Sequence, residues 1–252
     1  LFSRQKKFAP PQAASTGTPR LVWYQAPRAS LSLALKKIPP TPITRSIKAP
    51  PAHIAEHLKS LPASEGLGTS LPSVLGMLRR MSKESLLTLG SDKEVKLTTE
   101  GLVAAKNMIR RHRLAERFVV DLLGLELDKA HVEAHRLEHA ISPEVEARID
   151  ELLGYPTTCP FGGPIPDSKY SPPDKPVISL RDVGQGNLCR VIRVPEEDQE
   201  LLSFLVAQNV LPDEKVEIIE SSLHKGIIVI KTTRGEGAIG HLVAGRIWVT
   251  QE

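Results

Sequence analysis

The 252-residue sequence contains two cysteines, few aromatic residues and no long apolar stretch. Cys159 and Cys189 lack the spacing of a thiolate metal site or a redox pair, which is typical of a reducing compartment. No apolar run approaches the roughly 20 residues that a membrane-spanning helix requires. Residues 1–7 do not show the basic and then apolar pattern of an export signal. We therefore expect a cytoplasmic protein that makes no contact with a membrane.

The sequence also lacks a strong excess of one charge and the motifs of two common enzyme classes. Its 33 basic and 29 acidic residues give a formal net charge of +4. A polyanionic partner would therefore have to meet a local basic patch. No Gly-rich phosphate loop and no nucleophile elbow is present, so we do not expect nucleotide hydrolysis or serine hydrolase chemistry.

Composition divides the chain into proline-rich, helical and β-rich regions. Prolines crowd residues 1–51, which we expect to be largely irregular. A second segment rich in Pro, Gly and Ser, residues 155–176, is typical of a linker. Beyond it we expect strands and one helix, at residues 186–194, 196–208, 215–221, 226–232 and 245–250. The predicted domains are therefore 1–51 (irregular), 52–101, 102–154, 155–176 (linker) and 177–252 (small β-barrel).

The order of elements before residue 101 is that of a winged helix-turn-helix. Residues 52–58 form a short amphipathic run, and a longer helix over residues 72–87 has Ser70 as its cap. A two-strand ribbon over residues 89–98 follows, as the wing does in that motif. Three further helices are expected, over residues 101–123, 128–141 and 143–153. The predicted fold class is α+β.

The helix after Ser70 and the ribbon carry residues suited to a DNA backbone. Small residues at the start of the helix allow close approach, and basic residues at its end and on the ribbon supply positive charge. The candidate DNA-binding residues are Ser70, Pro72, Ser73, Gly76, Arg79, Arg80, Lys93 and Lys96. A solvated amphipathic helix with a basic end has the same pattern.

The strongest chemical signal is a cluster of imidazole and carboxylate side chains at helical spacing. The candidate metal ligands are His112, Glu116, His131, His135, Glu138 and His139. Side chains four residues apart lie on one helix face, so two facing helices could enclose one or two ions. Nitrogen and oxygen donors suit Mn²⁺, Fe²⁺, Co²⁺, Ni²⁺ or Zn²⁺. Solvated histidines on polar helix faces are the alternative interpretation.

Three motifs in this order resemble the diphtheria toxin repressor family of iron- and manganese-dependent transcriptional regulators. They are the runs at residues 111–117 (RHRLAER), 131–142 (HVEAHRLEHAIS) and 159–166 (CPFGGPIP), and the similarity covers roughly residues 52–250. The resemblance implies a homodimer whose winged helix binds a palindromic double-stranded DNA operator when metal is bound. It also implies a C-terminal SH3-like, FeoA-like domain.

The resemblance further implies two metal sites. It places His112, Glu116 and His131 in an ancillary site and His135, Glu138 and His139 in a primary site. The acidic run Glu196-Glu197-Asp198 is the nearest match to the oxygen ligands that an SH3-like domain lends, and we take Glu197 and Asp198 as the candidates. Family members have Cys or Glu at the position of His135, so the choice between Fe²⁺ and Mn²⁺ stays open.

The segment before Pro72 departs from the family pattern. The first helix of the family supplies a Met or Asp to the primary site, whereas its best counterpart here, residues 31–38, offers Leu33 or Ala34. The connector over residues 59–70 is also longer than the usual turn. Two alternatives to a repressor therefore stay open, a helical His/Glu metalloenzyme and a metal-binding dimer that no longer reads DNA.

Overall fold

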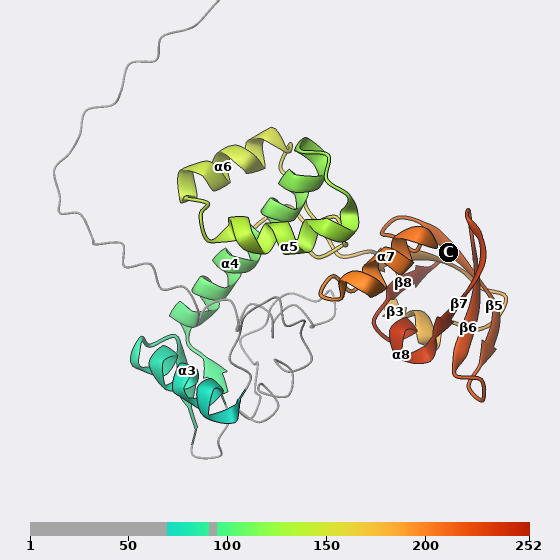
Figure 1. Cartoon of the computed structure of the whole chain (residues 1–252), viewed down its shortest axis with the longest axis horizontal. Coiled ribbons are helices and arrows are strands. Elements are labelled where there is room, and N and C mark those ends of the chain that lie inside the picture. The colour runs from blue at the N-terminus through green and yellow to red at the C-terminus, as the bar shows by residue number, and fades with distance from the viewer. Residues whose placement is uncertain (1–69, 91–94) are drawn as a thin grey trace, which may run out of the picture.

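The computed structural model describes residues 70–90 and 95–252. The predictions for residues 1–51, for the run 52–58, for most of the connector 59–70 and for Lys93 lie outside the described residues. Within the described part the chain forms three regions along its length, an N-terminal helix with a β-ribbon, a group of helices and a C-terminal sheet (Figure 1). This mixed architecture confirms the predicted α+β class.

The first described helix, α3 (Leu71–Lys83), begins where the sequence predicts. The side chain of Ser70 accepts a hydrogen bond from the backbone N–H of Ser73 at 3.3 Å, and Pro72 occupies the first turn. Both are features of a helix start. Val74, Met77, Leu78 and Met81 recur on one face and are buried. Burial of this apolar face holds α3 against the ribbon that follows.

The β-ribbon pairs β1 (Leu87–Leu89) with β2 (Val95–Leu97) in antiparallel register, with Thr88 opposite Lys96. The ribbon starts two residues earlier than predicted, because Leu86 and Leu87 pack into the apolar cluster beneath α3. Thr98 then caps α4 (Thr99–Arg117) by accepting from the N–H of Gly101 at 3.0 Å. The ribbon therefore leads into α4 without an intervening loop.

The central region consists of four consecutive helical elements. They are α4, the π-helix η2 (Phe118–Leu122), α5 (Leu127–Glu138) and α6 (Pro143–Leu152). Ser142 caps α6 as predicted, accepting from Val145 N–H at 3.3 Å. Helix α5 is shorter than the predicted 128–141, since it ends at Glu138 and leaves His139 as its C-cap.

The segment predicted as a linker, residues 155–176, is irregular, and its middle part packs into the protein. Cys159, Phe161 and Ile165 are buried, and Thr158 makes a single bridge to Pro164. Its motif CPFGGPIP therefore forms part of the core that joins the helices to the sheet.

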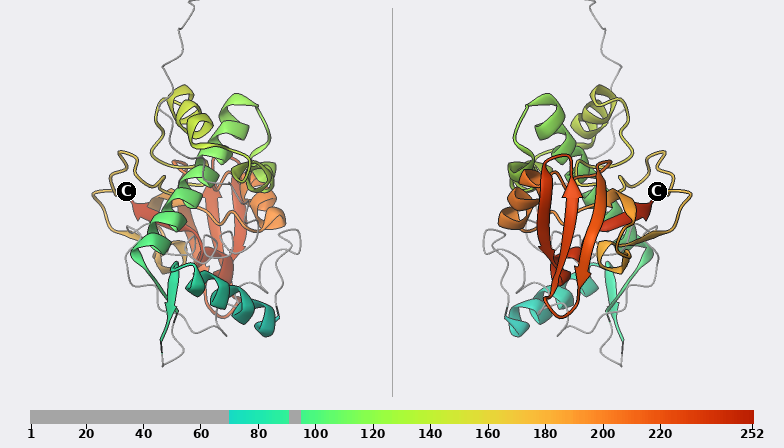
Figure 2. Two further views of the ribbon diagram at one scale, coloured as in Figure 1. Left: turned by 90° about the vertical axis from the view of Figure 1, so that its left-hand side faces the viewer. Right: turned by 90° about the vertical axis from the view of Figure 1, so that its right-hand side faces the viewer.

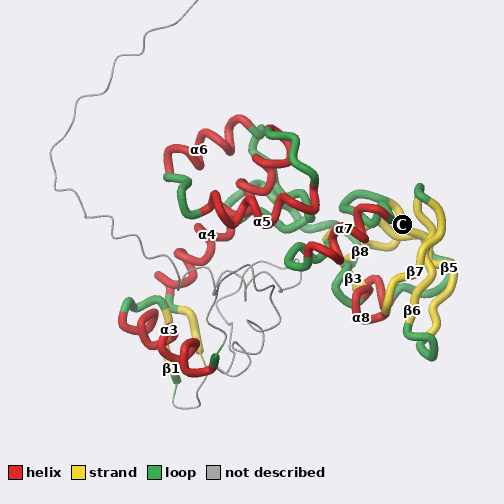
Figure 3. The backbone as a smooth tube through the Cα atoms, in the orientation of Figure 1, coloured by secondary structure: helices red, strands yellow, loops and turns green. Residues whose placement is uncertain are grey.

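The C-terminal region is one antiparallel sheet of six strands in the order β3-β8-β4-β5-β6-β7. The elements of this region are β3 (Val177–Ser179), the 3-10 helix η3 (Leu180–Asp182), β4 (Leu188–Arg193), α7 (Gln199–Ala207), β5 (Lys215–Ser222), β6 (Ile227–Thr232), β7 (Gly235–Gly240), α8 (His241–Ala244) and β8 (Trp248–Gln251). Figure 3 shows that the strands of the described residues lie in this sheet and in the short ribbon. Strands β3 and β7 and helix α8 are absent from the sequence prediction.

The sheet and the helices share one hydrophobic core. Val119 and Ala130 of the helical region belong to the same buried cluster as Val191 of β4 and Leu202 of α7. Helix α7 lies between the sheet and α5, and Figure 2 shows the helices behind the sheet when it is viewed from the β5–β7 strands. Among the described residues, no helix combines the length and apolar character needed to cross a membrane. The shared core fixes the loop between β4 and α7 beside α4 and α5.

Candidate metal centre

Helices α4 and α5 bring the predicted histidines and glutamates together in a buried cluster. His112 and Glu116 stand one turn apart on α4, and neither is accessible to solvent. His131 and His135 stand one turn apart on α5, which packs against α4. The ring centres of His112, His131 and His135 lie 4.5 to 4.9 Å from one another.

Glu116 holds the first half of the cluster. Its Oε1 lies 2.7 Å from His112 Nε2 and 3.0 Å from His131 Nδ1. The two ring nitrogens are themselves 3.2 Å apart. The three residues that the resemblance places in an ancillary site are therefore in direct contact.

Glu138 holds the second half and is also buried. Its Oε2 lies 2.8 Å from His112 Nδ1, while its Oε1 lies 3.2 Å from His135 Nδ1. His139 is more exposed, with Nε2 3.5 Å from the same Oε1. His112 thus contacts both carboxylates, and the two ligand sets form one continuous cluster.

The structure adds Glu196 to this cluster, a residue that the sequence analysis did not select. Glu196 is 1% exposed, and neither of its carboxylate oxygens has a hydrogen-bond partner. One ligand atom each from Glu116, His131 and Glu196 lie within 4.8 Å of one another. A buried carboxylate without a partner is costly, so a cation beside it would remove an existing penalty. The residues present therefore fit a divalent metal ion.

The predicted pair Glu197 and Asp198 has other hydrogen-bond partners. Glu197 Oε2 accepts a hydrogen bond from Arg246 at 3.1 Å. Asp198 caps α7 by accepting from Leu201 N–H at 3.0 Å. The acidic run was the sequence signal for this loop, but the residue that reaches the cluster is one position earlier than the predicted pair.

The histidines of the cluster lower the pKa of its two helix carboxyl groups. Burial raises the pKa of Glu116, but contact with His112 and His131 outweighs burial and holds this pKa well below its ordinary value. Burial likewise raises the pKa of Glu138, but the contacts with His112 and His135 outweigh burial, so this pKa is also below its ordinary value. Both carboxyl groups are therefore ionised, which is the form that binds metal.

A buried arginine and a buried thiol lie on the side of the cluster that faces the irregular segment. Arg113 donates to the carbonyl of Pro164, and burial lowers its pKa while the carboxylates of Glu196 and Glu116 act in the opposite direction. Burial raises the pKa of the Cys159 thiol well above its ordinary value, and the two carboxylates add to the effect. Arg113 therefore supplies positive charge close to two carboxylates of the centre.

The donor set consists of imidazole nitrogens and carboxylate oxygens. Such a set suits Mn²⁺ and Fe²⁺, and it also accepts Zn²⁺, Co²⁺ and Ni²⁺. The Cys159 thiol is not among the groups whose ligand atoms converge within 4.8 Å. The centre is therefore one for hard or borderline cations.

The candidate DNA-binding residues of α3 share an exposed face. Ser70, Pro72, Ser73, Gly76, Arg79 and Arg80 are all exposed, opposite the buried apolar face. A Cβ added at Gly76 would meet no atom within 4 Å. Lys96 is half-buried on β2. The described part of the predicted interface is thus one surface of a single helix next to the ribbon.

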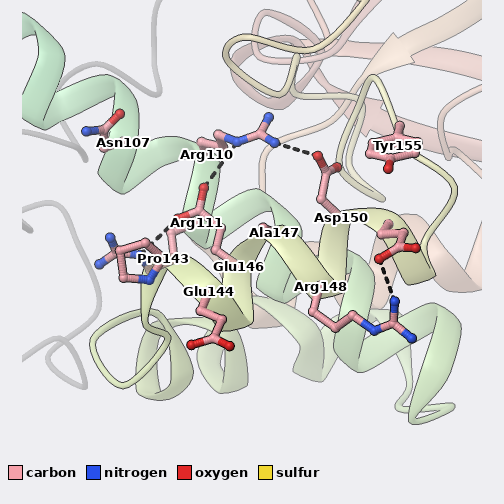
Figure 4. Close-up of a pocket in the computed structure, with 11 residues that line it drawn as sticks. Asn107, Arg110, Arg111, Pro143, Glu144, Glu146, Ala147, Arg148, Asp150 and Tyr155 are labelled. Atoms are coloured by element: carbon pink, nitrogen blue, oxygen red, sulfur yellow. Dashed lines mark hydrogen bonds and ion pairs between the residues drawn. The ribbon is translucent and has the colours of Figure 1, made fainter. Parts of the chain in front are cut away.

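A polar groove of about 790 Å³ between α4 and α6 holds ion pairs (Figure 4). Arg110 donates to Glu146 at 3.1 Å, to Asp150 at 2.6 Å and to the carbonyl of Pro166 at 2.9 Å. Arg148 pairs with Glu151 at 2.5 Å. The contacts of Arg110 tie α4 to α6 and to the irregular segment, so the ion pairs of the groove support the position of α4.

Comparisons with known proteins agree with this architecture. The family "Iron dependent repressor, metal binding and dimerisation domain" matches residues 98–167, and the FeoA domain matches residues 178–251. The chain is 33% identical over 179 residues to the iron-dependent repressor IdeR of Mycobacterium leprae, covering 66% of this chain and 78% of the relative. It is 34% identical over 181 residues to the diphtheria toxin repressor of Corynebacterium efficiens, covering 66% and 79%.

A solved structure extends the likeness to three dimensions. A manganese-dependent transcriptional repressor in complex with manganese matches with a TM-score of 0.68 and 30% identity, covering 82% of this chain and 92% of that one. The fold, the buried centre and the relatives together place the chain in one class of proteins, the metal-dependent transcriptional repressors. Within it, the chain belongs to the iron-dependent repressor family that includes the diphtheria toxin repressor. The resemblance seen in the sequence is confirmed, and the metalloenzyme alternative is set aside because this family is not enzymatic.

Proposed function

We propose that the chain is a homodimeric repressor that binds a palindromic operator when Fe²⁺ or Mn²⁺ occupies the centre between α4 and α5, and that it controls metal homeostasis genes in the cytoplasm. The observation that carries the proposal is the buried cluster with its unpaired Glu196 carboxylate. The proposed ligands are His112, Glu116, His131 and Glu196 for one site and His135, Glu138 and His139 for the other.

The proposed domains follow the sequence division. Residues 52–101 form the winged helix, with α3 as recognition helix and β1–β2 as wing, and residues 102–154 bind metal and dimerise. Residues 155–176 connect them to a C-terminal SH3-like domain at 177–252. Exposed apolar side chains on the central region, at Leu122, Leu123, Val145 and Leu152, support dimerisation, as does the matching family's description as a dimerisation domain.

Helix α4 links the metal centre to the DNA-binding part. Its N-terminus is fixed to the ribbon, because Thr98 Oγ1 donates to Ser85 O at 2.6 Å and Thr98 N–H donates to Leu86 O at 3.1 Å. Its C-terminal half carries His112 and Glu116. A bound cation supplies the positive charge that the converging carboxylates share. With a cation bound, the ligands of α5 and Glu196 would hold α4 in one position, and α3 and the ribbon would be held with it. The two recognition helices of a dimer would then match the half-site spacing.

A selection on DNA tests this proposal. Random-sequence duplexes are selected with Mn²⁺-loaded protein, and the enriched duplex is then used in gel shifts across a metal titration. We expect an inverted repeat whose binding requires metal, and we expect His139→Ala or His131→Ala to shift the metal dependence to higher concentration. Arg80→Ala should weaken DNA binding at saturating metal and lower the log–log salt slope by about 0.9 if it contacts one phosphate.

Arg234→Ala is the matched control, since Arg234 is an exposed arginine in the turn between β6 and β7 of the C-terminal sheet. It should change neither the metal dependence nor the salt slope. Enrichment of no sequence, or equal binding in metal and in chelator, would contradict the proposal.

A further inference from the structure

The loop between β4 and α7 contains three consecutive acidic residues whose side chains have different surroundings. Glu196 reaches the metal cluster and has no hydrogen-bond partner. Glu197 pairs with Arg246 at 3.1 Å, and Asp198 caps α7. Adjacent carboxylates repel one another, so a partner for the middle one affects the position of its neighbours.

Hydrogen bonds to three different parts of the molecule hold this loop. Val194 N–H donates to Phe161 O at 3.1 Å, which fixes the start of the loop to the irregular segment. The Asp198 cap fixes its end to α7. Arg246, which lies between α8 and β8, holds the middle through Glu197. Of the three, the contact of Arg246 is the one immediately next to Glu196.

The ion pair joins a buried carboxylate to a partly exposed guanidinium. The side chain of Glu197 is 9% exposed and that of Arg246 is 39% exposed. Because Arg246 is partly solvated, the pair contributes less to the free energy of unfolding than a fully buried pair does, but removal of Arg246 would leave the buried Glu197 carboxylate without this partner. The pair also restricts the direction of a side chain, and partners that orient metal ligands are known to affect metal affinity.

We propose that Arg246 is a positioning residue of the metal centre, which holds Glu197 so that the carboxylate of Glu196 faces Glu116 and His131. The inference rests on the proposed metal site. It adds to that site a residue that lies between α8 and β8, about 50 positions after Glu196 in the sequence. Arg246 itself does not touch the cluster in this arrangement. It acts through the backbone that Glu197 and Glu196 share.

The test is isothermal titration calorimetry of the 252-residue chain with Mn²⁺. It compares wild type with Arg246→Gln, Arg246→Lys, Glu197→Gln, Glu196→Gln and the double variant Arg246→Gln/Glu196→Gln. Arg190→Gln is the matched control, because Arg190 forms a similar pair with Glu252 at 2.9 Å on the same sheet. Circular dichroism and thermal unfolding in chelator report on folding independently of metal.

We expect Arg246→Gln and Glu197→Gln each to weaken Mn²⁺ binding at one site by about tenfold, as loss of a ligand-orienting partner does. Arg246→Lys should retain much of the affinity, and Arg190→Gln should leave it unchanged. In the Glu196→Gln background, Arg246→Gln should cause no further loss, since its effect passes through Glu196. A purely structural role would change unfolding in chelator and would add its loss to that of Glu196→Gln.

The outcomes separate this inference from the proposed function. Wild-type affinity in Arg246→Gln together with weakened binding in Glu196→Gln would overturn the role of Arg246 and leave the metal site standing. Equal losses for Arg246→Gln in both backgrounds would also overturn it. No Mn²⁺ binding by the wild-type protein would overturn the proposed function and this inference with it.

Discussion

At the scale of single residues, the six donors on α4 and α5 and the carboxylate of Glu196 differ in how they are stabilised without metal. The histidines of the helices contact Glu116 or Glu138. Glu196 is equally buried but has no such partner. A buried carboxylate that accepts no hydrogen bond destabilises a fold, and the nearby charge of Arg113 offsets only part of this cost. The C-terminal domain therefore carries the residue for which a bound cation would matter most.

Because the pKa of Glu138 is lowered in the folded protein, we predict that the metal-free protein loses stability in acid. The groups that face this carboxyl are His112, His135 and His139. A carboxyl whose pKa is lower in the folded than in the unfolded chain stabilises the fold above its ordinary pKa near 4.5, and this stabilisation is lost as the pH falls below that value. In chelator, the urea midpoint should therefore begin to fall as the pH drops through the ordinary value of 4.5 and should keep falling toward the lowered pKa of Glu138 in the folded protein.

Substitution of this carboxyl tests the assignment. Glu138→Gln should flatten the fall of the urea midpoint, whereas Glu100→Gln, at an exposed position near the start of α4, should not. The same steepness in Glu138→Gln and wild type would show that other groups cause the acid sensitivity.

At the scale of elements, two glycines predict opposite effects of the same substitution. A Cβ at Gly101, in the first turn of α4, would lie 1.7 Å from Leu86 O and 2.7 Å from Leu86 C. Because both are backbone atoms, the ribbon or the helix would have to move. Gly101→Ala should therefore destabilise the protein by about 1–3 kcal/mol or more.

Gly76→Ala is the matched variant, since its Cβ would meet open space in the middle of α3. It should stabilise the fold by about 0.5–1 kcal/mol, because alanine favours a helix over glycine. If α3 is the recognition helix, the same change should weaken operator binding. Thermal unfolding in chelator and gel shifts in Mn²⁺ measure the two effects, and a stabilised variant with unaltered DNA affinity would remove Gly76 from the interface.

Elements with local signals could be predicted from the sequence. Ser70 and Ser142, each with a proline in the following turn, mark the starts of α3 and α6. Strand β7 could not be predicted, because its sequence GEGAIG lacks β-branched residues apart from Ile239. It forms because all six of its residues pair with β6 and Ile239 is buried.

The metal centre shows the same division between local and long-range information. Histidines and glutamates at helical spacing on α4 and α5 could be chosen from the sequence because a helix determines which side chains share a face. Glu196 depends on how the β4–α7 loop docks against a helix about 80 positions earlier. Within an acidic run of three residues, no local pattern tells which one points toward the helices.

At the scale of the whole molecule, the sheet and the helices are one packed body. Besides the shared hydrophobic core, Ser203 of α7 donates to Asp128 of α5 at 2.7 Å. Residues from α4, α5 and the β4–α7 loop meet at the centre, and α4 continues to the ribbon beside α3. Occupation of a single small site can therefore affect the position of the DNA-binding part.

The most direct test of this account is the fluorescence anisotropy of one labelled operator duplex with one protein sample. Chelator is present first, then an excess of Mn²⁺ or, without oxygen, Fe²⁺ is added, and finally more chelator. The account predicts low anisotropy in chelator, a rise on addition of metal that salt suppresses, and a return when the metal is removed. Anisotropy that is equally high before and after the metal, or that stays low although the protein takes up metal, would contradict it.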